Sequence, residues 1–438
     1  MANFYDIAYV TGLALSSPYW LLRGRLRRKV FTALRNRCGE APQIASSQPA
    51  VLIHAVSVGE INATPPLVAA LRSARPDLAF VVSTTTDDGL TRGRELYPAG
   101  ADVLLVRYPL DLSWMVGRFL DRLGPAVVVL MELEVWPNFL RACAKRSVPV
   151  VLANGRLTDG SFHRYSLVKG IAAKMFGALA ALCVQDETYA QRFVALGAAP
   201  HGVHICGTMK FDTAAVANSV AGDAELAVAL GLGGPDPIWV CGSTGPGEEA
   251  IILGVYRRLL ASHPKLRLAI VPRHRARFDE VARIIREHHF GLVRRSCIQL
   301  PPPSSPTAVI LGDTMGELRR FYALANVVLV GRSLVDLGHR QNGSDMIEPA
   351  ALAKPVVVGS YTANFAQPMR LFLAADAMRV VRGEGELHAA LATLLSSPPQ
   401  AAAMGKRAQQ VVRQNQGSTA RHAQIILQQL ERRPAAGR

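Results

Sequence analysis

Short apolar runs alternate with helical stretches along most of this chain, and the alternation starts again in the second half. The expected strands are 51–56, 79–83, 102–106, 127–131, 148–153 and 181–184, then 238–241, 266–271, 308–311, 327–330 and 355–358. Strands that are apolar throughout, rather than at every second residue, are typical of sheets buried on both faces. The pattern therefore predicts an α/β fold in which helices cover two parallel sheets.

The length of 438 residues exceeds what one hydrophobic core usually supports, so we expect two domains of roughly 200 residues each. The Ala- and Gly-rich stretch 214–236 has little strand character and several breakers, which places the connection there. The expected division is an N-terminal segment 1–30, a first domain 31–213, the connection 214–236, a second domain 237–400 and a C-terminal part 401–438 with a helix over about 401–430.

The charge of the chain restricts its partners. Lys and Arg outnumber Asp and Glu, and the net charge is +16. Nucleic acid, an anionic membrane and phosphorylated substrates are all attracted to such a surface. Because aromatic residues make up only 6% of the chain and no nucleic-acid-binding module is recognisable, an anionic lipid surface and an anionic lipid substrate fit better.

The N-terminus predicts a membrane contact. Residues 7–22 are largely apolar with aromatic residues among them, and the basic cluster 23–29 follows. The segment is shorter than the roughly 20 residues that span a bilayer, Pro18 interrupts it, and it lacks the features of a signal peptide. We expect an anchor at the membrane interface. The alternative is a helix buried against the first domain.

The cysteines predict no disulfide framework and no metal site. They are scattered, without a CxxC pair or clustered histidines, which favours small buried residues in a reducing cytosol. The six positions are Cys38, Cys143, Cys183, Cys206, Cys241 and Cys297.

The stretch Ser57-Val58-Gly59-Glu60 directly follows the first expected strand. A small-residue turn there holds a carboxylate at a rigid strand end, where it can take a proton from a sugar hydroxyl. The alternative is that Glu60 lies in the first turn of the next helix, where a carboxylate stabilises the helix dipole.

The second half contains two candidate anion-binding turns. The turn 242–247, with Ser243 and Thr244, follows a strand and precedes a helix, so its N–H groups suit a phosphate; an ordinary strand-to-helix turn is the alternative. It lacks the Walker ending, and no GxGxxG follows any strand. Arg273 and His274 lie at the carboxyl end of an expected strand and suit a phosphate, whereas Arg275 and Arg277 suggest a solvated basic face.

Further motifs follow in a fixed order, and together with 57–60 they resemble the Kdo transferase family. They are MELEVWPN (131–138), NGRL (154–157), GTMKFD (207–212), PRH (272–274), DTMGEL (313–318) and EPA (348–350). The resemblance extends from about Tyr5 to about Arg379. The family attaches 3-deoxy-D-manno-octulosonic acid (Kdo) from CMP-Kdo to the lipid A precursor of Gram-negative outer membranes.

This resemblance implies a GT-B type glycosyltransferase: two Rossmann-like domains facing a cleft, an N-terminal membrane-associated helix and a C-terminal helix that packs back on the first domain. It also implies a position at the cytoplasmic face of the inner membrane and an inverting transfer that needs no metal or cofactor. Glu60 is then the general base that activates a hydroxyl of lipid IVA.

The resemblance also distributes roles among the other residues. The alternation of Glu132 and Glu134 suggests that both share one strand face, as supporting carboxylates. The donor phosphate and Kdo are assigned to Lys210, Ser243, Thr244, Arg273 and His274, CMP to Met315, Gly316, Glu317 and Glu348, and the acceptor side to Arg156 and Ser161. Without the resemblance, an unpaired surface lysine is the commoner interpretation of Lys210.

Two of these roles have a chemical reason in the sequence. Glu348 suits the two ribose hydroxyls, because a carboxylate accepts both hydrogen bonds. The loop 313–318 lines the cytosine pocket by resemblance; its other interpretation is a helix N-terminus capped by Asp313 or Thr314, and the two are compatible.

The chain departs from the family at two places. The stretch 338–348 differs from the usual Gly-Gly-His-Asn-Pro-Leu-Glu run, with Ser344 and Asp345 where His and Asn are expected. Gly160 stands where the family usually has Arg, so one positive contact on the acceptor side is missing or supplied elsewhere. The alternative functions are another GT-B glycosyltransferase, a sugar-nucleotide epimerase, and a non-catalytic membrane-surface binding protein of the same fold.

Overall fold

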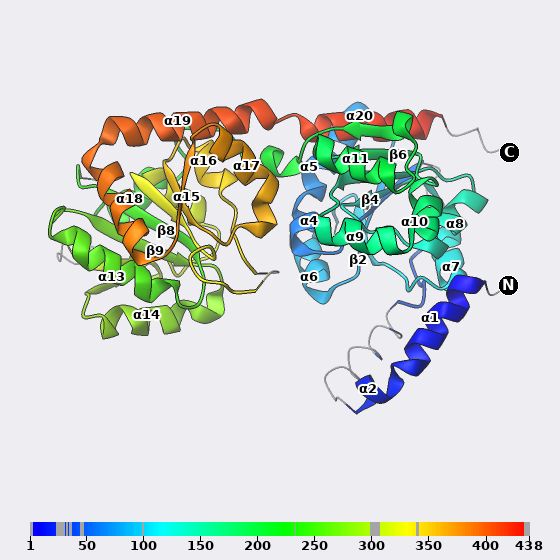
Figure 1. Ribbon diagram of the computed structural model, residues 1–438, viewed down its shortest axis with the longest axis horizontal. Coiled ribbons are helices and arrows are strands. Elements are labelled where there is room, and N and C mark those ends of the chain that lie inside the picture. Colours follow the sequence, from blue (N-terminus) through cyan, green and yellow to red (C-terminus); the bar gives the residue numbers. More distant parts are fainter. Residues whose placement is uncertain are drawn as a thin grey trace. The chain divides into compact units, whose positions relative to one another are not determined.

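The computed structural model of the protein describes residues 3–22, 31, 34, 37–43, 48–98, 100–232, 234–297, 307–338 and 341–432. The chain forms two compact units. Unit 1 comprises Met1–Thr213 with Gln416–Arg438, and unit 2 comprises Ala214–Asn415. Figure 1 shows the red C-terminal helix lying with the blue to green elements of unit 1.

Unit 1 contains a seven-stranded parallel sheet in the order β3-β2-β1-β4-β5-β6-β7. Its strands are β1 (Ala50–His54), β2 (Ala79–Thr84), β3 (Val103–Arg107), β4 (Pro125–Met131), β5 (Val150–Gly155), β6 (Ala181–Val184) and β7 (Val203–Ile205). In register, Leu52 of the central strand pairs with Val81 on one side and Val128 on the other. The strand order reverses between β1 and β4, and ligands of open α/β sheets bind beyond the carboxyl ends of strands at such a point.

Helices cover both faces of this sheet, as the apolar strands predict. Leu52 faces a core that includes α7, α8, α10 and α11, whereas Val51 and Ile53 face a core with α4, α5 and α20. The helices of unit 1 are α1 (Phe4–Leu15), α2 (Ser17–Leu21), α4 (Val58–Asn62), α5 (Thr64–Ala74), α6 (Asp87–Leu96), α7 (Ser113–Leu123), α8 (Pro137–Lys145), α9 (Asp159–Leu167), α10 (Lys169–Phe176), α11 (Glu187–Ala195) and α20 (Ser418–Glu431), with the 3-10 turns η1 (Pro200–Gly202) and η2 (Met209–Thr213).

Unit 2 contains a second seven-stranded parallel sheet, in the order β10-β11-β9-β8-β12-β13-β14. Its strands are β8 (Ile238–Thr244), β9 (Arg267–Pro272), β10 (Leu292–Arg294), β11 (Val309–Leu311), β12 (Val327–Val330), β13 (Val356–Gly359) and β14 (Met378–Val381). Its helices are α12 (Asp223–Ala229), α13 (Glu248–Leu260), α14 (Phe278–Glu287), α15 (Leu318–Leu324), α16 (Ile347–Ala351), α17 (Ala366–Ala374), α18 (Glu384–Ser396) and α19 (Pro398–Asn415), with the 3-10 turns η3 (Arg275–Arg277), η4 (Arg295–Cys297) and η5 (Ala363–Phe365). Here the order reverses between β8 and β12.

The expected strands did not include β10 and β14. Two further stretches differ from the expected elements. The stretch 214–236, expected to be only a connection, contains α12 and belongs to unit 2. The helix expected over 401–430 is two helices, because Gly417 takes a left-handed φ of 84° between α19 and α20. α19 belongs to unit 2, whereas α20 packs in unit 1 against α5 and the strands β4, β5 and β6.

The N-terminal segment forms two helices rather than one. α1 ends at Leu15, and Pro18 occupies the first turn of α2, so the expected interruption is confirmed. Asp6 is the one residue of α1 that is buried, so this helix is not buried against the domain. The basic cluster 23–29 lies outside the described residues. Among the helices that the structure describes, none has both the length and the apolar character needed to cross a membrane.

Candidate active site

Glu60 lies beyond the carboxyl end of β1, in the first turn of α4. Ser57 caps this helix: its hydroxyl oxygen accepts a hydrogen bond from the Glu60 N–H and its O–H donates to Glu60 Oε1 at 2.8 Å. Glu60 Oε2 accepts from the Val56 N–H at 2.9 Å. Ser57 and Glu60 therefore form a capping box, in which each side chain accepts a hydrogen bond from the other residue's backbone N–H. This agrees with the alternative interpretation, in which Glu60 stabilises the start of the helix. The capping box leaves the carboxylate at the end of β1, so a capping role and a role as general base are compatible.

The pKa of Glu60 suits a base at neutral pH. Burial raises it to about 7, and the nearby negative charge of Glu132 acts in the same direction, with a smaller contribution from Glu134. The hydrogen bonds from Val56 and Ser57 oppose this shift. A general base is most effective when its pKa lies near the working pH, so this environment fits proton abstraction.

Glu132 and Glu134 do not share a strand face. β4 ends at Met131, and both residues lie in the turn that follows, because Glu132 takes a left-handed φ of 55° that ends the strand. The Glu134 carboxylate accepts a hydrogen bond from Trp136 Nε1 at 3.3 Å, and burial raises its pKa. Both carboxylates nevertheless act on Glu60, since the β1 and β4 ends are adjacent at the reversal point of the sheet.

Asn154, near the carboxyl end of β5, connects that strand to the segment after β6, to η2 and to α20. It also has a left-handed φ, 56°, and its backbone N–H, backbone oxygen and side-chain oxygen are all paired. Its N–H donates to His422 Nε2 at 2.9 Å, its backbone oxygen accepts from Gln185, and Oδ1 accepts from the Met209 N–H at 3.2 Å. Asn154 therefore fixes the turns that carry two candidate cations, Arg156 after β5 and Lys210 in η2.

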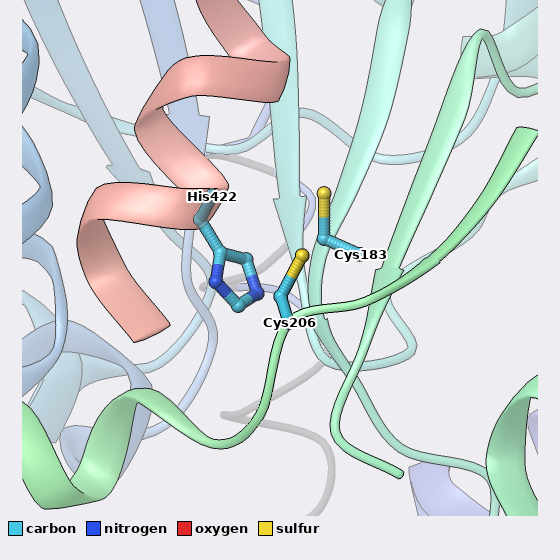
Figure 2. A group of neighbouring side chains, drawn as sticks. All are labelled: Cys183, Cys206 and His422. Carbon is cyan, nitrogen blue, oxygen red and sulfur yellow. The ribbon is translucent and has the colours of Figure 1, made fainter. Parts of the chain in front are cut away.

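Cys183, Cys206 and His422 form a buried group that the sequence spacing conceals (Figure 2). Their ligand atoms lie within 4.8 Å of one another, and His422 comes from α20 while the cysteines come from the sheet and the loop after β7. The histidine is already occupied on both sides: Nε2 accepts from Asn154, and Nδ1 lies 2.8 Å from the Ser418 backbone oxygen. These residue types could bind a metal, but the hydrogen bond of His422 instead attaches α20 to Asn154 of β5.

Ser161, which the resemblance assigns to the acceptor, lies in the first turn of α9, whose N-cap is Thr158. The Ser161 hydroxyl accepts from Thr158 Oγ1 and from Arg164 Nη2, both at 3.2 Å. Gly160 has no neighbouring atom within 4 Å of the position a Cβ would take. Arg164 is four residues further along the helix, so it provides a cation on the same helix face as the missing arginine.

In unit 2 the turn after β8 is occupied by the carboxylate of Glu248, the first residue of α13. Glu248 is fully buried and accepts hydrogen bonds from the N–H groups of Gly245, Arg332, Ser333 and Leu334. The Thr244 hydroxyl donates to Glu249 at 2.7 Å, and both Ser243 and Thr244 are buried. The Gly245 N–H, which the sequence offered to a phosphate, is therefore paired with a side chain of the fold.

Cationic side chains gather near the carboxyl ends of β9 and β12. Arg273 and His274 follow β9 and are exposed, and Arg332 follows β12 with a left-handed φ of 58°. Burial lowers the pKa of Arg332, and the charge of Arg273 lowers it further. The pKa of His274 is lowered by burial and then by Arg332 and Arg273. Among the described residues neither arginine forms an ion pair with a carboxylate, so the group is suited to an anion.

Arg332 was missed from the sequence because no motif marks it. The signal lies in the sheet order, since Arg332 follows the strand that borders β8 at the reversal point. Arg277, in contrast, was expected on a solvated face and is buried. Arg277 lies in η3, and its Nη1 is 2.6 Å from Oε1 of the buried Glu249 carboxylate on α13.

The loop 313–318 does not cap α15 through Asp313. That carboxylate instead accepts from Arg294 Nε at 2.6 Å and from Ser296, and α15 begins without a side-chain cap. The Glu317 carboxylate is paired with Arg295 at 3.0 Å and with Arg320. Met315 is exposed, and Gly316 has a left-handed φ of 84° with open space beside it. The surface that remains free for a base is therefore that of Met315 and Gly316.

Glu348 lies in the first turn of α16 and is partly buried. Burial raises its pKa to about 7, the charge of Asp345 raises it further, and Arg319 and Arg273 oppose the shift. Asp345 Oδ1 accepts from the Ile347 N–H at 2.9 Å and so orders the turn before α16, while the Ser344 hydroxyl donates to the Ser243 backbone oxygen. The residues 339–340 of the divergent stretch lie outside the described residues.

Two parallel-sheet α/β units of this order define the class of protein as a GT-B glycosyltransferase fold. A glycosyltransferase from Rickettsia africae has a TM-score of 0.59 at 12% identity, over 89% of this chain and 100% of that chain. A UDP-GlcNAc 2-epimerase from Neisseria meningitidis, solved with UDP-GlcNAc bound, has a TM-score of 0.55 at 15% identity, over 87% and 99%. At these identities the likeness shows the fold alone.

The sequence identifies the family within this class. Residues 32–213 match the model for 3-deoxy-D-manno-octulosonic-acid transferase. The 3-deoxy-D-manno-octulosonic acid transferase of Haemophilus influenzae is 34% identical over 87% of this chain and 87% of its own length. The transferase of the same name from Bordetella pertussis is 32% identical over 95% and 96%. The chain belongs to the Kdo transferase family and is a glycosyltransferase.

Proposed function

We propose that the protein transfers Kdo from CMP-Kdo to the lipid A precursor lipid IVA, with Glu60 as the general base. The observation that carries the proposal is the Glu60 carboxylate, fixed by Val56 and Ser57 at the β1 end with its pKa raised to about 7. The names of the Haemophilus and Bordetella relatives support the sugar, and the basic surface supports an anionic lipid acceptor.

Glu60 takes the proton of the acceptor hydroxyl as that oxygen attacks the anomeric carbon of Kdo. Glu132 and Glu134 tune this step, because their negative charges keep the Glu60 pKa high. Arg156, Ser161 and Arg164 bind the phosphorylated sugar of the acceptor. A single displacement of this kind inverts the anomeric configuration.

Unit 2 binds the donor. Arg273, His274 and Arg332 hold the phosphate of CMP, Glu348 accepts hydrogen bonds from the ribose hydroxyls, and Met315 with Gly316 contacts cytosine. The cations stabilise negative charge on the departing phosphate, which is a strong form of transition-state stabilisation. In the proposal, the ammonium group of Lys210 binds the carboxylate of Kdo. CMP leaves as a stabilised anion, so the proposed mechanism uses neither a metal nor a general acid.

The proposed location is the cytoplasmic face of the inner membrane, with peripheral attachment through α1. Large apolar side chains of this helix are exposed, among them Phe4 at 71%, Ile7 at 61% and Leu15 at 78%. A helix of this kind lies in the interface with its apolar side chains among the acyl chains.

The test is a transfer assay with the purified protein, CMP-Kdo and lipid IVA in detergent, read by mass spectrometry of the lipid. We expect a mass increase of one or more Kdo units and release of CMP. UDP-sugars offered in place of CMP-Kdo should give neither transfer nor epimerisation. Turnover of a UDP-sugar without any Kdo transfer would favour the second candidate, an enzyme with the activity of the fold neighbours.

A further inference from the structure

Unit 1 contains an apolar cavity of about 280 Å³ that the proposed mechanism does not use. One wall is α1, through Tyr9, Val10 and Leu13. The opposite wall is the segment 108–112 between β3 and α7, together with Trp136. These α1 side chains remain more than a third exposed, so the cavity is accessible from outside.

Hydrogen bonds hold the helix that forms this wall. Asp6 accepts from the Ser113 N–H at 2.8 Å and from its hydroxyl, and it also accepts from Asn138 Nδ2. Asn3 donates to Asn138 Oδ1 at 2.8 Å. These contacts fix the start of α1 at the N-termini of α7 and α8, and the cavity follows one turn later along α1.

One cation borders the cavity. Arg37 donates to the backbone oxygens of Tyr108 at 2.9 Å and Pro109 at 3.0 Å. Within the described part of the chain it forms no ion pair with a carboxylate. Asp111 lines the same cavity, and its carboxylate accepts hydrogen bonds from the Asn138 and Phe139 N–H groups. Both charged side chains are thus held by contacts within the protein, and the remaining lining is mostly apolar, which complements an apolar chain.

Trp136 connects the cavity to a carboxylate of the proposed active site. Trp136 lines it and donates a hydrogen bond to Glu134, whose charge acts on Glu60. The α1 side of the cavity carries several exposed apolar residues, among them Ile7 and Val10. The cavity thus lies between α1, the helix proposed to attach to the membrane, and the turn that carries Glu134.

We propose that this cavity binds one acyl chain of the acceptor and thereby positions the acceptor hydroxyl at Glu60. The volume lies just below the roughly 300–1,000 Å³ of pockets for drug-sized ligands, which suits one chain rather than a whole lipid. The inference rests on the proposed function, because it assumes a lipid acceptor.

The experiment fills the cavity from each wall, with Leu110→Trp and Leu13→Trp. The matched control is Leu373→Trp, which makes the same change at a leucine of α17 that is 49% exposed and not part of the cavity. Steady-state kinetics use two acceptors in detergent: lipid IVA, and the same phosphorylated sugar with its acyl chains removed. Thermal melting of each variant checks that it is folded.

Both filled variants should raise KM for lipid IVA at least tenfold and leave kcat/KM for the deacylated acceptor unchanged. Leu373→Trp should change neither. Unchanged KM for lipid IVA in folded variants would overturn the acyl-chain site. Loss of vesicle binding without a change in KM in detergent would assign the cavity to a membrane lipid and also overturn it. If the wild-type protein transfers Kdo to neither acceptor, the proposed function itself fails.

Discussion

At the residue scale, Glu60 has two roles that use the same carboxylate. It caps α4 through Ser57, and its pKa is raised to about 7 by burial and by Glu132. Capping alone usually lowers the pKa of a carboxylate, because the hydrogen bonds favour the charged form. Here desolvation outweighs those bonds. A short motif revealed this residue because strand, turn and cap are local in sequence.

Transfer should depend on pH through this group. A base must be deprotonated, so kcat should rise with pH along a limb with an apparent pKa near 7, which belongs to the coupled carboxylates together. Glu132→Gln removes one negative charge, lowers the pKa of Glu60 and should move the limb to lower pH. The exposed change Glu95→Gln is the control. A limb that stays in place would contradict the coupling.

The cationic group of unit 2 should carry most of the affinity for CMP. Arg273→Ala and Arg332→Ala each remove a charge-assisted contact and should raise the Kd for CMP roughly tenfold to a hundredfold by calorimetry. Arg275→Ala, next to Arg273 and exposed, should leave the Kd within about twofold. Equal effects of all three changes would indicate general attraction to a basic surface rather than a phosphate site.

At the element scale, α20 fixes the turn after β5. His422 accepts the buried Asn154 N–H, and its pKa is lowered to about 4, so it is neutral at physiological pH. His422→Ala leaves that N–H unpaired and should lower the free energy of unfolding by about 1–3 kcal/mol in urea titrations. The exposed change His201→Ala should cost less than about 0.5 kcal/mol. Similar losses in both variants would show that His422 does not hold the turn.

The elements themselves were largely predictable, and the exceptions have physical causes. Buried parallel strands are apolar throughout, so their positions follow from composition. The break between α19 and α20 depends on the left-handed φ of Gly417, and the neighbouring residues do not indicate that a helix ends there. The contacts of Cys183 with His422, and of Arg277 with Glu249, join residues far apart in sequence, so local patterns cannot reveal them.

At the scale of the whole molecule, attachment to a membrane should combine an apolar and an electrostatic contribution. Ile7→Glu with Leu15→Glu puts charge on exposed positions of α1 and should reduce sedimentation with anionic vesicles at least tenfold. The control Val194→Glu makes the same kind of change on α11 and should have little effect. High salt alone should release the wild-type protein poorly, because burial of apolar side chains is not screened.

Deletion of residues 1–29 extends this test to the entire segment. The shortened protein should remain in the soluble fraction at low salt and keep most of its activity on a detergent-dispersed acceptor. Because the deletion also removes the Asp6 contacts with Ser113, a melting curve is needed beside it. Full-length protein that is soluble at low salt would contradict the anchor.

The central claim is that Glu60 is the general base of Kdo transfer, and Glu60→Gln tests it most directly. Glutamine can still complete the capping box, so the variant should fold and bind CMP as the wild type does. Transfer of Kdo from CMP-Kdo to lipid IVA should fall by a hundredfold or more, since loss of a general base usually costs at least that factor. A folded Glu60→Gln variant that keeps more than about a tenth of wild-type activity would contradict the account.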